Sequence, residues 1–131
     1  MSLMIIAGLV FAALGALIHV YIFFLESIAW TGAAARRTFG TTDATVEITK
    51  PFAYNQGFYN LFLAISVFLG IVFVATGSTA IGATLVFVGA GSMVAAGLVL
   101  LLSDRSKARA AMIQLTAPLL GVVLLAIGLA L

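Results

Sequence analysis

Four long runs of apolar residues, separated by shorter polar segments, fill most of this sequence. The runs cover about 3–27, 55–76, 80–102 and 111–131, and each is longer than 20 residues. An α-helix needs roughly 20 apolar residues to cross about 30 Å of hydrocarbon. The pattern therefore predicts an all-α polytopic membrane protein, in which four spanning helices form an up-down bundle.

Composition agrees with this fold class and limits what else the chain contains. Hydrophobic residues make up 64% of the 131 residues and charged residues only 8%, whereas soluble domains carry about 25% charged residues. Four spans and their connections use the whole length, so we expect a single domain over 1–131. The absence of cysteine excludes disulfides and thiolate metal sites.

The three connections differ in length and polarity. The first, over 31–54, is long and polar; the second, near 77–79, is short and uncharged; the third, over 103–110, is short and charged. Within the first connection, Thr42 or Asp43 is expected to cap a short helix that Pro51 stops.

The basic residues predict the orientation of the bundle. All six Lys and Arg lie in the first and third connections, three in each. The positive-inside rule places such loops in the cytoplasm, so both termini are expected outside a bacterial inner membrane. Contact with membrane lipids also accounts for these charges without a nucleic-acid partner.

Polar side chains within the spans gather in the half next to the basic connections. On the first helix, His19, Glu26 and Trp30 follow one another at i, i+7 and i+11, which places them on one face. Polar groups in a membrane usually face the bundle interior or a cavity. We therefore predict a ligand-binding pocket in the cytoplasmic half, rather than a pore, lined by His19, Glu26, Trp30, Asn55, Gln56, Tyr59, Asn60 and Gln114.

Several roles stay open for individual members of this set. His19 is either a neutral imidazole bonded to Asn60, Glu26 or a backbone carbonyl, or a group that carries a proton or contacts a ligand. A metal role is less favoured, because the chain has no His/Cys cluster. Trp30 is expected in the aromatic belt at the membrane interface. No catalytic motif and no cofactor motif is present.

The run from His19 to Glu26, together with Trp30, Phe39-Gly40 and the element Asn55-Gln56-Gly57-Phe58-Tyr59-Asn60, resembles a bacterial family of small four-helix membrane proteins. That family is known only as domain of unknown function number thirteen hundred and four. The resemblance implies four spans and a pattern centred on these polar residues, and it implies no activity, cofactor or substrate.

Three functional hypotheses follow from the pattern. The first is a protein that binds or transports a small molecule through the polar pocket. The second is a membrane enzyme that acts on a lipid or a quinone-like substrate, with His19 as acid and base; this is less favoured. The third is a structural or assembly subunit whose polar residues form a packing network. Because bundles this small commonly pair, a homodimer is also expected.

Overall fold

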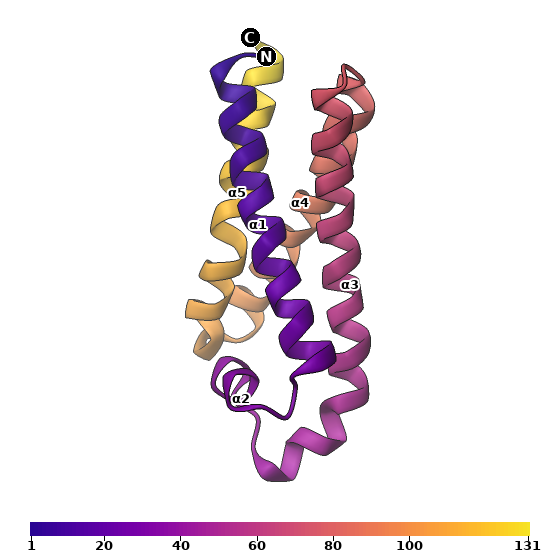
Figure 1. Ribbon diagram of the computed structural model, residues 1–131. Coiled ribbons are helices and arrows are strands. Elements are labelled where there is room, and N and C mark those ends of the chain that lie inside the picture. The colour runs from indigo at the N-terminus through magenta and orange to yellow at the C-terminus, as the bar shows by residue number, and fades with distance from the viewer.

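The computed structural model describes residues 1–131 and consists almost entirely of helices (Figure 1). Four helices are long and apolar enough to cross a membrane, which confirms the predicted all-α membrane fold. In chain order the elements are α1 (Leu3–Phe23), the π-helical turn η1 (Phe24–Ile28), α2 (Ala33–Phe39), α3 (Asp43–Ala75), α4 (Thr79–Ser103), the 3-10 turn η2 (Arg105–Lys107) and α5 (Ala108–Ala130).

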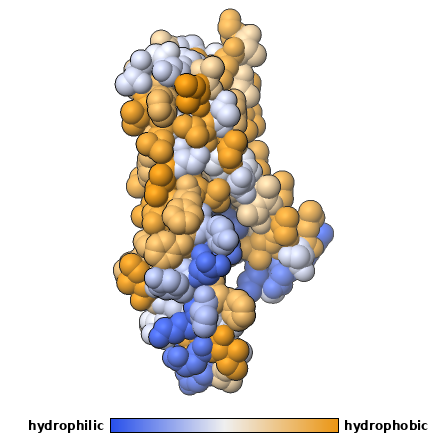
Figure 2. Space-filling view, turned by 90° about the vertical axis from the view of Figure 1, so that its right-hand side faces the viewer, coloured by the Kyte–Doolittle hydropathy of each residue, from blue (hydrophilic) through white to orange (hydrophobic).

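The four long helices form a closed ring. Helix α1 packs against α3 and α5, and α4 packs against the same two helices from the opposite side, with little contact between α1 and α4. Both termini lie at one end of the bundle, and α2 and the beginning of α3 lie at the other end (Figure 1). Figure 2 shows the most hydrophilic side chains gathered at the end that contains α2.

Small residues bring the helices into backbone contact. A Cβ atom added to Gly8 of α1 would lie 2.5 Å from the Leu125 nitrogen of α5, and one added to Gly82 of α4 would lie 2.5 Å from the Gly70 oxygen of α3. Lipid supplies no hydrophobic driving force for helix association, so the helices are held together by this close packing. The central core between the helices contains a cluster of buried apolar residues: Leu9, Ala12, Ala16, Ala64, Val67, Val74, Val86, Ala90, Met93 and Leu125.

The expected stop at Pro51 is wrong, because α3 is one continuous helix from Asp43 onward. Proline removes the backbone bond to the carbonyl four residues earlier, which here belongs to Glu47. Both residues are exposed, so water or headgroups can satisfy that carbonyl. Thr42 caps the helix as expected, in a capping box with Thr45. Figure 1 shows the first turns of α3 bent away from the rest of the helix.

Candidate ligand-binding site

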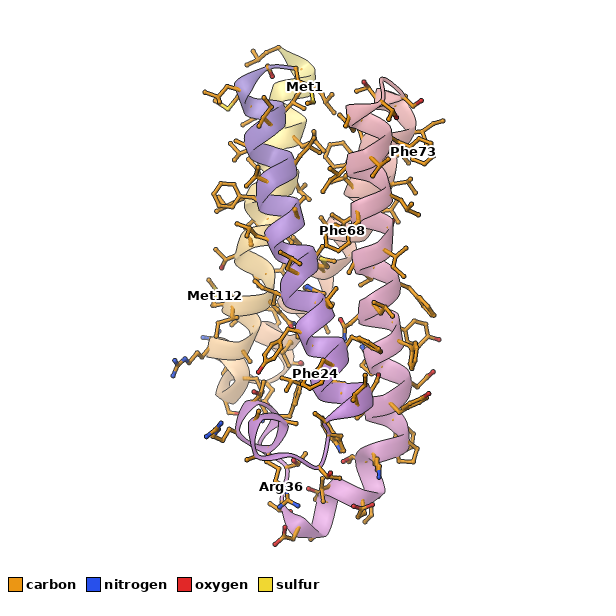
Figure 3. All side chains as sticks on the ribbon, in the orientation of Figure 1. Met1, Phe24, Arg36, Phe68, Phe73 and Met112 are labelled. Carbon is orange, nitrogen blue, oxygen red and sulfur yellow. The ribbon has the colours of Figure 1, made fainter.

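The first spanning helix changes its winding where the polar end of the bundle begins. In η1 the Ala29 N–H donates to the Phe24 carbonyl five residues earlier, at 2.9 Å. Glu26 lies in the middle of this turn. Short π-helical turns of this kind are rare and often occur at functional sites. Figure 3 labels Phe24, at the start of the turn, near the lower end of the bundle, and Arg36 at the tip opposite Met1.

A hydrogen bond to α3 fixes the Glu26 carboxylate. The Asn60 Nδ2 donates to Glu26 Oε2 at 2.8 Å, and Glu26 is only 9% exposed. The two helices approach closely here because Gly57 has no side chain: an added Cβ would lie 3.1 Å from the Glu26 Cβ. A second bond, from Ser27 Oγ to the Tyr54 carbonyl at 2.7 Å, strengthens the same contact.

Trp30 lies inside the protein and not in an aromatic belt, which corrects its expected place. Its indole N–H donates to the Val46 carbonyl at 3.1 Å, and its ring centroid lies 5.2 Å from that of Phe39. The tryptophan belongs to a small apolar cluster with Leu25 and Ala35. It is enclosed because α3 begins twelve residues before the expected span, so the added turns cover the indole.

A shallow surface cavity of about 350 Å³, wide open to the outside, adjoins Glu26 and Trp30; Phe52 in its wall is 75% exposed. We call it the Glu26 cavity. Its lining combines one carboxylate with hydroxyl and amide groups and with apolar walls, and includes no cation. The Thr41 hydroxyl oxygen is buried without a hydrogen-bond partner. The other lining residues are Thr49, Phe52, Ala53 and Gln56.

The comparison with family models decides the classification. A family described as a protein of unknown function (DUF1304) matches residues 13–126. The chain belongs to the DUF1304 family. The match covers η1, Asn60 and the whole Glu26 cavity. Neither a curated protein nor a solved structure matches the chain, and the family description assigns no activity.

In this DUF1304 protein His19 is separate from the Glu26 cavity. The imidazole Nδ1 bonds to the Gly15 carbonyl one turn earlier, at 2.8 Å, and the side chain is 2% exposed. A Cβ added to Gly15 would lie 2.6 Å from the Pro118 ring, so this stretch of α1 packs against α5. Of the roles considered for His19, the structure shows the imidazole bonded to a backbone carbonyl.

The remaining predicted residues of the DUF1304 chain do not all meet at one place. Gln56 lines the Glu26 cavity, whereas Asn55 and Tyr59 are exposed on the outside of α3. Gln114 lines a second cavity on another side of α1. The predicted residues that line a cavity are therefore divided between two cavities, and η1 contributes to both, through Glu26 and Leu25.

Four lining residues of the DUF1304 site were not predicted from the sequence. Thr41, Thr49, Phe52 and Ala53 all fall in the stretch interpreted as a polar connection. A signal was nevertheless available, because Val46, Thr49 and Ala53 follow a helical spacing of i, i+3 and i+7 that predicts one helix face.

Proposed function

We propose that this protein binds a small amine in the Glu26 cavity, in the cytoplasmic half of an inner-membrane bundle. The observation that carries the proposal is a buried carboxylate, held on a π-helical turn by Asn60, in the wall of a cavity of about 350 Å³. Ligand pockets commonly measure roughly 300–1,000 Å³, so this one suits a ligand of few atoms.

The hydrogen bonds at the cavity favour a ligand that donates. Glu26 Oε2 accepts from Asn60, and Oε1 has no hydrogen bond within the protein. The buried Thr41 hydroxyl likewise has no partner. A charge or polar group in a low-dielectric site is costly unless it is paired. An ammonium group would donate to the free oxygen of Glu26, and it has no acceptor atom of its own.

The walls favour a ligand with an apolar body. Phe52 and Trp30 contribute aromatic surface to the cavity, and aromatic faces attract cations as well as alkyl groups. No lysine or arginine lines the cavity, so nothing in its wall already neutralises Glu26. Together these groups select for positive charge at one end of a short apolar molecule.

Binding is favoured over conduction through the membrane. Between the Glu26 cavity and the termini lie a cluster of buried apolar side chains and helices in backbone contact, and the one buried ionisable side chain there, His19, is bonded to the Gly15 carbonyl. Transport would need these contacts to open. The positive-inside rule puts the cavity on the cytoplasmic side, next to the basic connections.

The test compares three probes of one size and different charge: n-butylamine, n-butanol and butyrate. Binding to the purified protein in detergent is followed by saturation-transfer NMR. We expect butylamine to bind best and Glu26→Gln to weaken it by about tenfold or more, since a hydrogen bond to a charged group contributes about 1.5–3 kcal/mol. Glu47→Gln is the matched control, because this carboxylate is exposed on α3 and does not line the cavity.

Two results would contradict the proposal. One is butyrate binding as tightly as butylamine. The other is a Glu26→Gln protein that binds butylamine normally and shows only a lower unfolding temperature, which would make the Glu26–Asn60 bond a structural contact between helices.

A further inference from the structure

A second cavity, of about 610 Å³, lies between α1, α2 and the connection from α4 to α5. We call it the basic cavity. Three cations line it, Arg37, Lys107 and Arg109, and no carboxylate does. Its charge is thus opposite to that of the Glu26 cavity. Figure 2 shows this end of the molecule divided by a hollow, with hydrophilic side chains on both sides.

The cations of the basic cavity are not neutralised by the protein. The single salt bridge of the chain joins Arg36 to Asp43, so Arg37 and Arg109 have no acidic partner. The nearest acid along the connection, Asp104, accepts from the Ser106 N–H at 3.0 Å and from the Ser106 hydroxyl at 2.6 Å. These bonds hold the pKa of the Asp104 carboxyl below its ordinary value, and the carboxylate lies outside the cavity lining.

Lys107 fixes the shape of the basic cavity. Its Nζ donates to the Phe39 carbonyl at the end of α2, at 2.9 Å. This bond joins two connections that are 68 residues apart in sequence and ties the end of α2 to η2. Arg37 and Arg109 are therefore brought to one opening by a defined contact rather than by chance proximity of loops.

The inner wall of the basic cavity is apolar and belongs to the spanning helices. On α1 and η1 it includes Ile18, Ile22 and Leu25, which extend over seven residues, or about 10 Å at 1.5 Å per residue. Leu100 of α4 and Ile113 of α5 complete this wall. A cationic opening thus leads to an apolar surface that reaches toward the hydrocarbon.

We propose that the basic cavity binds an anionic phospholipid, with its phosphate at Arg37 and Arg109 and an acyl chain against Ile22 and Ile113. Arginine binds phosphate oxygens with two parallel N–H donors. Basic pockets between spanning helices on the cytoplasmic side are typical sites for lipid headgroups. The apolar wall distinguishes a lipid from a soluble phosphate, which would gain nothing from it.

The experiment measures bound lipid by native mass spectrometry of the detergent-purified protein. The probes are dioleoylphosphatidylglycerol, dioleoylphosphatidylcholine and glycerol phosphate, which separate the charge from the acyl chains. We expect the first to bind at least about tenfold more tightly than the other two. The double variant Arg37→Gln/Arg109→Gln is expected to lose this advantage. Arg105→Gln is the matched control, since Arg105 is exposed on the same connection and does not line the cavity.

A second variant keeps the test decisive should the double arginine variant fail to fold. Ile113→Trp fills the apolar wall and is expected to weaken phosphatidylglycerol binding while glycerol phosphate binding stays unchanged. An equal loss in Arg105→Gln would overturn the proposal in favour of diffuse surface charge. Equal affinity for phosphatidylcholine, or for glycerol phosphate, would overturn the assignment to an anionic lipid.

Discussion

Gly57 lies where α3 touches the π-helical turn, so a single methyl group there tests the geometry of the Glu26 site. An alanine Cβ at Gly57 would overlap the Ser27 hydroxyl and lie 3.1 Å from both the Glu26 Cβ and the Phe23 carbonyl. Gly91 of α4 provides the control, because an added Cβ there meets nothing within 4 Å.

The expected loss of stability combines three effects. Overpacking costs about 1–3 kcal/mol, and displacing the Ser27 hydroxyl from the Tyr54 carbonyl costs about 1 kcal/mol. Alanine in place of glycine stabilises a helix by about 1 kcal/mol, which offsets part of this loss. Gly57→Ala should therefore lower the free energy of unfolding by about 1–3 kcal/mol, whereas Gly91→Ala should leave it equal or about 1 kcal/mol higher.

The assay is reversible unfolding in mixed micelles, followed by circular dichroism and by the fluorescence of Trp30, the only tryptophan. A double-mutant cycle with Ser27→Ala sharpens it. Removing the Ser27 hydroxyl makes room for the new methyl, so the double variant should be about 1 kcal/mol more stable than the sum of the single losses predicts. The reasoning is refuted should Gly57→Ala prove as stable as Gly91→Ala, or should Ser27→Ala bring no recovery.

Two further predictions concern the connections. The Arg36–Asp43 pair is exposed, with 92% of the Asp43 side chain accessible, so Asp43→Asn should cost less than about 1 kcal/mol and nothing measurable at high salt; a loss that persists at high salt would contradict this. Ser106→Ala should raise the pKa of Asp104 toward its ordinary value in a carboxyl NMR titration, because one of the two bonds that lower it is removed. The stabilisation from this carboxylate is present above the unfolded-state pKa of Asp104 and is lost as pH falls through its lower folded-state pKa.

The spans were predictable from the sequence because lipid imposes a simple rule on length and polarity. The four apolar runs, the Thr42 cap and the antiparallel order all follow from hydropathy and helix-end chemistry. The extent of α3 did not follow, because proline is ordinarily read as a helix stop. That reading holds for a buried helix interior and fails for Pro51, which is exposed near a helix start.

The candidate site was predictable only in part: Glu26, Trp30 and Gln56 of its lining were identified from the sequence, and the other lining residues and the arrangement were not. Glu26 and Asn60 were identified as polar groups at similar depth, and they do bond to each other. A regular helix would also have aligned His19 with Glu26, seven residues apart. The π-helical turn inserts one extra residue into the helical turn after Phe23. A single sequence contains no pattern that predicts such a turn. This change of register helps to explain why His19 and Glu26 have separate surroundings.

The two cavities share one wall, which links the two binding proposals physically. Trp30 lines the Glu26 cavity, and its ring lies 5.2 Å from that of Phe39, which lines the basic cavity. The Phe39 carbonyl in turn accepts from Lys107. A ligand that moves α2 in either cavity must therefore change the surroundings of Trp30. The free energy of coupling between two binding sites is reciprocal. If bound phospholipid changes the affinity for butylamine by some factor, bound butylamine must change the affinity for that phospholipid by the same factor.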